Sequence, residues 1–161
     1  MSRLKMTLLG MLVPLVLAGC VSEPQSTPSS RVPVISLEAV LPPESLLRDD
    51  TLAALSHDHS RSRLAYVGVW ASDGDKCAMM DQTEFEGFAV ITPDSIRRSS
   101  GTCTFPPTSP GETSVMLDAT CKGRGSRNRA YGVQMIDSES LNLSTAPGQP
   151  GTQMVRCRLQ K

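Results

Sequence analysis

The sequence predicts an all-β protein: a small antiparallel barrel or sandwich of seven to eight strands with two disulfides, preceded by a signal peptide and a flexible tether. Three observations predict this class. From Arg63 onward, apolar and polar residues alternate with a period of two, which is typical of strands with one buried face. Turn-forming pairs such as Asp73-Gly74 and Pro110-Gly111 separate these runs at short intervals. Four cysteines lie in this part of the chain, an even number that suits two bridges.

Seven segments have the composition of strands. Val115, Leu117 and Ala119 alternate with polar or flexible residues, whereas Phe88–Thr92 is a short apolar run of the kind that a core strand shows. Regular short strands separated by turns favour a barrel or a sandwich, and closure would remove exposed edges that invite aggregation. The predicted strands are Leu64–Ala71, Phe88–Thr92, Ile96–Phe105, Val115–Lys122, Arg129–Ile136, Leu141–Ser144 and Met154–Leu159.

The cysteines of the predicted domain are Cys77, Cys103, Cys121 and Cys157. None of them forms a CxxC pair, so a zinc site is disfavoured and two disulfides in an exported chain are expected. Three pairings are open. We favour Cys103–Cys121 across neighbouring strands and Cys77–Cys157 joining the start of the domain to its end.

The first 62 residues differ in composition from the predicted β domain, which we place at residues 63–161. Residues 1–19 begin with Arg3 and Lys5, continue with an apolar run and end in small residues, which is the order of an export signal. Residues 20–62 start with a Pro- and Ser-rich stretch and predict a flexible tether. Within it, the acidic pair Asp49-Asp50 ahead of a Leu/Ala run predicts a short helix.

The tetrad Leu17-Ala18-Gly19-Cys20 resembles the lipobox of bacterial lipoproteins. The resemblance implies cleavage before Cys20 and attachment of acyl chains to that residue. Each buried methylene contributes about 0.8 kcal/mol, and more than one chain gives stable anchoring. Val21 stands where many lipoproteins retained in the inner membrane have aspartate, so the resemblance implies the outer membrane, facing the periplasm.

The charge balance favours neither nucleic acid nor any strongly charged partner. The leader contains two of the 16 basic residues and none of the 16 acidic ones, so the remaining chain has 14 basic and 16 acidic residues. Basic residues nevertheless gather in the middle of the domain, where they are expected either to meet an anionic partner or to form an ordinary charged outer face. An anionic partner here means lipopolysaccharide, a wall polymer or an acidic protein. These residues are Arg97, Arg98, Lys122, Arg124, Arg127 and Arg129.

No catalytic residue, metal site or cofactor is expected. Residues 63–161 contain no histidine, so nucleophilic schemes have no imidazole base inside the domain. His57-Asp58-His59 supplies too few ligands for a structural metal site and is interpreted as the polar end of a helix. Asp73-Gly74-Asp75 lacks the glycine and glutamate that a calcium loop requires at later positions.

Trp70 is the single tryptophan and lies on the first predicted strand, where we expect it to organise the core, with a ligand contact as the alternative. Gly68-Val69-Trp70 followed by Cys77 resembles the opening strand of bacterial metalloprotease inhibitors and their envelope lipoprotein relatives. That resemblance implies an eight-stranded barrel, although this chain has four domain cysteines where that family has two. With Arg156-Cys157 near the end, the domain also resembles small, uncharacterised alphaproteobacterial envelope lipoproteins, which implies no activity.

We therefore expect a lipid-anchored envelope protein whose domain is a non-catalytic periplasmic binding module, with hydrolase inhibition as one form of that activity. The alternative is a structural envelope lipoprotein without a discrete ligand. A binding module should present a concave or edge site with Trp70, Tyr66 or the arginines partly exposed. A structural lipoprotein should bury all its large apolar groups beneath an even cover of charge.

Overall fold

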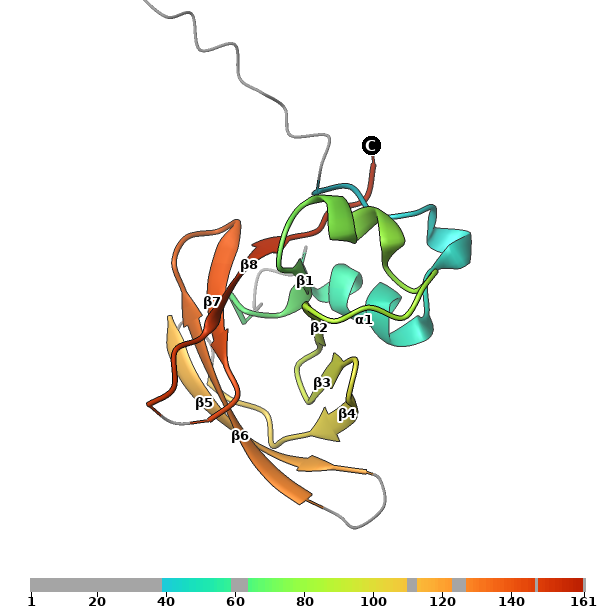
Figure 1. The fold of residues 1–161 in the computed structure, drawn as a ribbon. Coiled ribbons are helices and arrows are strands. Elements are labelled where there is room, and N and C mark those ends of the chain that lie inside the picture. The colour runs from blue at the N-terminus through green and yellow to red at the C-terminus, as the bar shows by residue number, and fades with distance from the viewer. Residues whose placement is uncertain (1–38, 59–63, 110–112, 123–126, 147, 161) are drawn as a thin grey trace, which may run out of the picture. The chain divides into compact units, whose positions relative to one another are not determined.

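Eight antiparallel strands form a closed barrel in the computed structural model, which describes residues 39–58, 64–109, 113–122, 127–146 and 148–160 (Figure 1). Each strand pairs with the next along the chain, and β8 pairs with β1 to close the ring. The strands are β1 (Gly68–Ala71), β2 (Phe88–Ile91), β3 (Ser95–Arg98), β4 (Gly101–Thr104), β5 (Ser114–Cys121), β6 (Arg127–Met135), β7 (Ser140–Ser144) and β8 (Thr152–Arg156).

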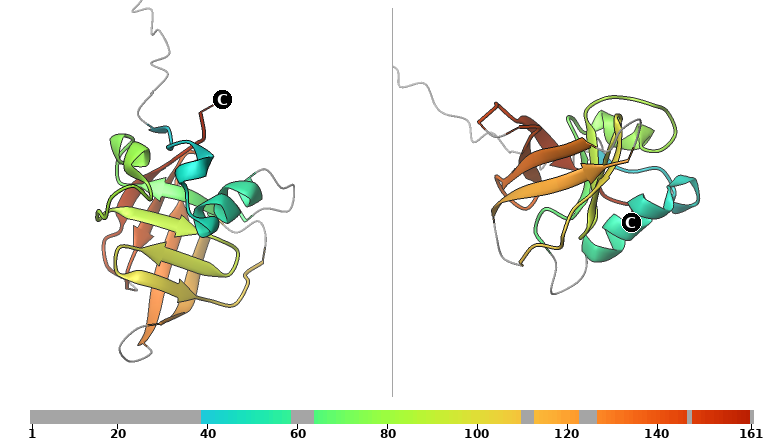
Figure 2. Two further views of the ribbon diagram at one scale, coloured as in Figure 1. Left: turned by 90° about the vertical axis from the view of Figure 1, so that its right-hand side faces the viewer. Right: turned by 90° about the horizontal axis from the view of Figure 1, so that it is seen from below.

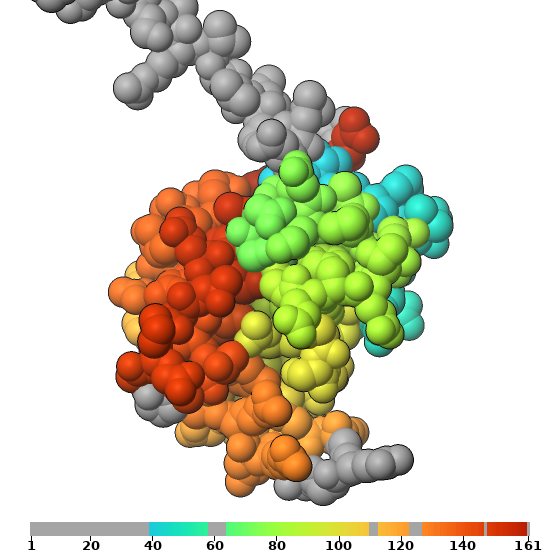
Figure 3. Space-filling view, viewed as in Figure 1, coloured from blue at the N-terminus to red at the C-terminus, as the bar shows by residue number. Residues whose placement is uncertain are grey.

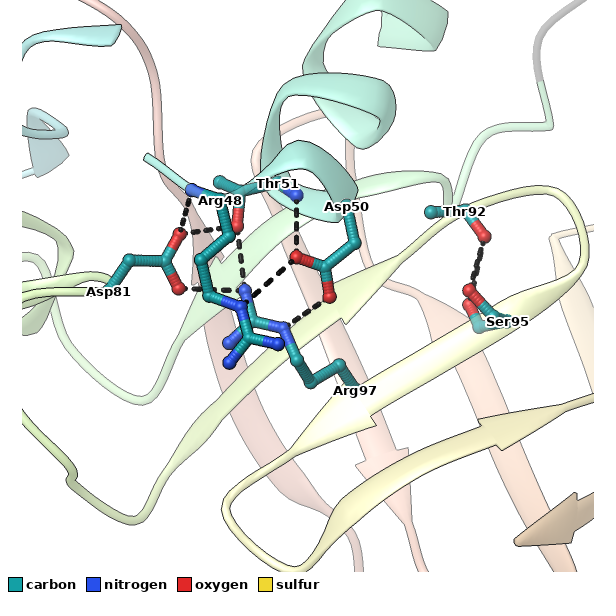
Figure 4. A network of polar contacts seen from close by, with 7 residues as sticks. All are labelled: Arg48, Asp50, Thr51, Asp81, Thr92, Ser95 and Arg97. Carbon is teal, nitrogen blue, oxygen red and sulfur yellow. Dashed lines mark hydrogen bonds and ion pairs between the residues drawn. The ribbon is translucent and has the colours of Figure 1, made fainter. Parts of the chain in front are cut away.

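The predicted all-β class is confirmed, and the barrel rather than the sandwich is the architecture. One predicted strand, Ile96–Phe105, is two strands, because the chain reverses between Arg98 and Gly101. Gly101 has φ of 120°, a conformation that side-chain-bearing residues rarely adopt, and this permits the tight turn. At the other end of β3, the Thr92 and Ser95 hydroxyls lie 2.6 Å apart and tie the β2–β3 turn (Figure 4).

The barrel interior is filled by side chains from every strand. Alternation along β5 sends Val115, Leu117 and Ala119 inward while the residues between them face solvent. Eight strands enclose a space that side chains of this size fill. Trp70 is 0% exposed, and its indole N–H donates to the Tyr66 carbonyl at 2.9 Å. The predicted core role of Trp70 agrees with this placement.

A second apolar cluster lies on the outer side of β1 and β2. Val69, Ala71 and Val90 face away from the interior and pack against helix α1 (Asp49–Asp58), the 3₁₀ turn η3 (Asp75–Met79) and Leu47, which follows the 3₁₀ turn η2 (Glu44–Leu46). Figure 2 shows these helical segments covering that side of the sheet. The apolar residues of α1 that enter the cluster include Ala54 and Leu55.

The predicted helix is present, but the packed part of the chain begins earlier than residue 63. Leu41 and Leu47 are buried in the outer cluster, so residues 39–58 are part of the folded unit and are not tether. Leu41 N–H donates to the Arg158 carbonyl at 2.8 Å, which also pairs this segment with the C-terminal residues. The alternation of apolar and polar residues does not reveal this segment, because its apolar residues are few and the barrel residues that it packs against are distant in sequence. The leader, Cys20 and the tether up to residue 38 lie outside the described residues.

Both favoured disulfides are present. Cys103–Cys121 joins directly opposed residues of β4 and β5, and Cys77–Cys157 joins η3 to the residue after β8. The second bridge fixes the long β1–β2 connection to the C-terminal end of the barrel. Within the described ranges, no helix is long and apolar enough to cross a membrane.

Candidate binding groove

A buried arginine on β3 ties helix α1 to the barrel wall (Figure 4). Arg97 Nε donates to Asp50 Oδ2 at 2.5 Å, and Arg97 Nη2 donates to Thr51 Oγ1 at 2.7 Å and to Asp81 Oδ1 at 2.8 Å. The Arg97 side chain is 8% exposed and that of Asp81 is 0% exposed. Buried charges are tolerated only when they are paired with an opposite charge and hydrogen-bonded, and the charges of Arg97 and Asp81 meet both conditions.

Asp81 joins three segments of the chain. Its Oδ2 atom accepts the Arg48 backbone N–H at 3.0 Å and the Thr51 hydroxyl at 2.6 Å, while its other oxygen meets Arg97. Burial alone would raise the pKa of Asp81, but these two hydrogen bonds and the Arg97 charge together hold it below the usual value. Asp81 also has φ of 63°, which its short polar side chain tolerates. The network therefore sets the position of the loop that follows.

A groove of about 630 Å³ runs beside this network. One wall is the β1–β2 loop from Asp81 to Glu86, the other is the β3–β4 turn from Arg98 to Thr102, and Arg97 and Phe88 form the base. Figure 3 shows these two walls side by side on the surface. A second hollow of about 460 Å³ shares Glu86, Arg98 and Ser99 with it and reaches Thr152 at the start of β8. We call the two together the Arg98 groove.

The structure divides the predicted basic residues into groups. The expectation that Arg97 belongs to an accessible basic surface is wrong, because its guanidinium is buried and paired with two carboxylates. Arg98 is half-buried and lines both hollows. Arg127 is exposed at the start of β6 and lines neither hollow, and Arg124 lies outside the described residues.

Arg98 and Arg127 nevertheless share one end of the barrel. In a barrel whose neighbouring strands are all antiparallel, successive connections alternate between the two ends, so the β3–β4 and β5–β6 connections lie at the same end. Lys122 and Arg129 are exposed on either side of the β5–β6 connection.

Trp70 takes no part in the groove. Its ring is fully buried, and the Arg156 guanidinium lies 4.2 Å from the ring centroid, so the alternative of a ligand contact is excluded. Tyr66 is 1% exposed. A binding module was expected to have Trp70, Tyr66 or the arginines partly exposed, and among these only arginines are exposed.

The motifs considered for metal binding have other roles. Asp73 accepts the Lys76 backbone N–H at 3.1 Å and pairs with Lys76 Nζ at 3.0 Å, so its carboxylate is engaged with a residue of η3. His57 is exposed near the end of α1, and His59 lies outside the described residues. Across the parts of the chain that the structure describes, no three His, Cys, Asp or Glu side chains are grouped to hold a metal ion.

Sequence reasoning missed the contribution of Phe85. This residue lies between Glu84 and Glu86, in a stretch for which the sequence predicts no binding role. Its ring is half-buried, and its centroid lies 5.1 Å from that of Phe88. A lone aromatic residue among acidic ones is the signal that would have indicated it.

No protein family, no curated protein and no solved structure matches this chain. The Arg98 groove thus has to be interpreted from its own chemistry. It offers one aromatic face, two arginines with accessible side chains (Arg48 and Arg98), two exposed glutamates (Glu84 and Glu86) and the hydroxyls of the β3–β4 turn. Such a set can pair with charged groups and make apolar contact.

Proposed function

We propose that this protein is a lipid-anchored protein of the bacterial envelope whose barrel is a non-catalytic binding module facing the periplasm. The leader and the tetrad that ends at Cys20 support the anchor and the address. The two disulfides support export, because such bonds persist in oxidising compartments and are rare in the cytosol.

The Arg98 groove is the observation that carries the binding role. The barrel interior is packed with the molecule's own side chains, so a ligand has to bind at the surface. The groove is concave, and its walls are fixed by the Arg97 network and by the Cys77–Cys157 bridge. A site that is already ordered binds its partner without the entropic cost of ordering a loop.

Two measurements test this function. Mass spectrometry of the native protein should find Cys20 as the first residue, carrying acyl chains, and Cys20→Ser should leave the protein unlipidated. Isolation of the intact lipidated protein from the cell envelope should recover a stoichiometric partner. A soluble cytosolic protein that retains residues 1–19 would refute the anchor, and isolation without any partner would refute the binding module.

Hydrolase inhibition is a narrower form of the same proposal. The full-length protein at stoichiometric concentration should then slow a metalloprotease or a lysozyme. No effect on a panel of both enzyme types would refute the inhibition hypothesis. The binding-module hypothesis would then depend on the isolation of a partner from the envelope.

A structural envelope lipoprotein is the second candidate, and one observation favours it. Trp70 and Tyr66 are both buried, which is the arrangement expected of a domain without an aromatic ligand site on its first strand. This candidate predicts that deletion of the protein weakens the envelope while substitutions in the Arg98 groove leave it unchanged.

A further inference from the structure

The aromatic residues of this chain point to one accessible contact site. The chain has three Phe, two Tyr and one Trp, and all six lie among the described residues. Phe85 alone is partly exposed. The five that are buried are Tyr66, Trp70, Phe88, Phe105 and Tyr131. Since aromatic residues are enriched where proteins bind one another, the accessible ring of Phe85 marks the Arg98 groove as a contact surface.

Arg98 is available for a ligand, unlike its neighbour Arg97. The Arg98 side chain makes no hydrogen bond or ion pair with any residue that the structure describes, although Arg98 is half-buried and lines both hollows. Its guanidinium donors are therefore not engaged by the described part of the chain. Its planar donors match a carboxylate in two parallel hydrogen bonds, so it is suited to receive one.

The charges around the groove restrict the kind of ligand. Glu84 and Glu86 stand on the wall opposite Arg98 and are exposed, so a polyanion lying along the groove would meet like charge. Phe85 is a single ring, which does not provide the successive stacking faces that single-stranded nucleic acids use. A polypeptide can place one carboxylate and one apolar side chain next to each other, with donors toward the glutamates.

We propose that the Arg98 groove binds a segment of a partner protein in which an acidic side chain pairs with Arg98 and a neighbouring apolar side chain packs on Phe85. This inference rests on the proposed function as a binding module and names the chemistry of its partner. Arginine and aromatic residues in one desolvated pocket are the composition of interface hot spots. Most of the binding free energy should therefore come from contacts with the side chains of Arg98 and Phe85.

The first experiment locates the partner in the native envelope. Phe85 in the full-length lipidated protein is replaced by the photo-reactive analogue benzoylphenylalanine, and irradiation is followed by mass spectrometry of the adduct. The expected adduct is a peptide that contains Asp or Glu. It should disappear in Arg98→Glu and persist in Arg127→Glu, which makes the same charge change at the same end of the barrel but outside the groove.

The second experiment measures the two contacts with a synthetic peptide of the cross-linked sequence. Arg98→Ala in the full-length protein should weaken its binding by about tenfold or more, the effect expected of a hot-spot residue. Arg98→Lys should lose less, since an ammonium retains the charge but not the paired donors. Replacing the acidic residue of the peptide by Arg should restore binding to Arg98→Glu.

The remaining outcomes overturn the inference. They are adducts that Arg98→Glu leaves unchanged, adducts with lipid or polysaccharide only, and the absence of adducts at position 85. A photo-reactive residue at Met116, which is 47% exposed on the outer side of β5, separates this failure from failure of the proposed function. A protein adduct at position 116 with none at position 85 would refute the Arg98 groove as the binding site but retain the proposed function as a binding module. No adduct at either position would refute both.

Discussion

Arg97→Ala is expected to destabilise the protein strongly at neutral pH. The substitution leaves the Asp81 carboxylate fully buried with only the Arg48 N–H and the Thr51 hydroxyl as donors. Removing one partner of a buried ion pair typically costs about 3–5 kcal/mol, because the other charge stays buried and uncompensated. Against a total stability of about 5–15 kcal/mol for a natural domain, this is a large fraction. The change also removes the ion pair between Arg97 and Asp50, which is one of the contacts that hold α1 on the barrel.

The size of the effect should depend on pH in a defined direction. An aspartate in the unfolded chain has a pKa of about 3.9, and in the folded protein the pKa of Asp81 lies below its usual value. The folded state then binds fewer protons than the unfolded state, so stability rises with pH through this window. The contribution of Asp81 is complete above the unfolded pKa and is lost as the pH falls through the folded pKa. In Arg97→Ala the burial of Asp81 remains without its cation, so its pKa rises and the two proteins should converge in acid.

Urea unfolding followed by the fluorescence of Trp70, with both disulfides intact, measures this effect at pH 7 and pH 3. Thr51→Val is the matched control, because it removes a hydroxyl from the same network while keeping its shape and charges. Its expected cost is about 1–2 kcal/mol. A difference of less than about 1 kcal/mol between wild type and Arg97→Ala at pH 7 would refute the reasoning, as would an equal difference at both pH values.

Three further outcomes follow from the structure. Replacing both cysteines of the Cys77–Cys157 bridge by Ala should cost about 4.5 kcal/mol by loop entropy, against about 3 kcal/mol for Cys103–Cys121, since the sequence separations are 80 and 18 residues. Thermal unfolding of the two double variants checks the order, and equal losses would contradict it. Arg156→Met should cost about 3 kcal/mol and shift the emission of Trp70, because Arg156 stacks on that ring and donates to at least three backbone carbonyls. Unchanged emission would contradict the stacking. Arg127→Glu should stay within about 0.5 kcal/mol of wild type, as expected of an exposed side chain, and a larger change would show that it has a structural role.

Most of the barrel could be predicted from the sequence because the signals are local. Alternation along β5 and β8 and the turn residues between strands identified the strands within a few residues. The cysteine pairs followed from strand adjacency and the span of the domain. The break at Ser99 and Ser100 was missed although Ser99-Ser100-Gly101 is a turn-forming sequence, and the pairing of Arg98 with Gly101 shows the turn.

The position of α1 against the barrel could not be predicted in the same way. Its acidic start and Leu/Ala content indicate a helix, but not that Asp50 and Thr51 bind an arginine 46 or 47 residues further along the chain. Charge pairs of this kind depend on distances between segments that composition and period do not contain. The same holds for Asp81, because the residues next to it in sequence do not indicate that it is buried and paired with Arg97.

Strand alternation does predict one difference between the neighbouring residues Arg97 and Arg98, namely the side of the sheet that each faces. Ile96 faces the interior, so Arg97 has to face the outer side, where the helical segments cover it, and Arg98 has to face the side of Ile96. An arginine on the inner side of a strand needs either hydrogen-bond partners, which Arg156 has in three backbone carbonyls, or a strand end that water or a ligand reaches. Alternation therefore separates two adjacent arginines into one that is buried and paired with carboxylates and one whose side chain has no partner among the described residues. The two alanine substitutions should therefore have different effects. Arg97→Ala should lower stability, whereas Arg98→Ala should lower affinity for the proposed partner and leave stability nearly unchanged.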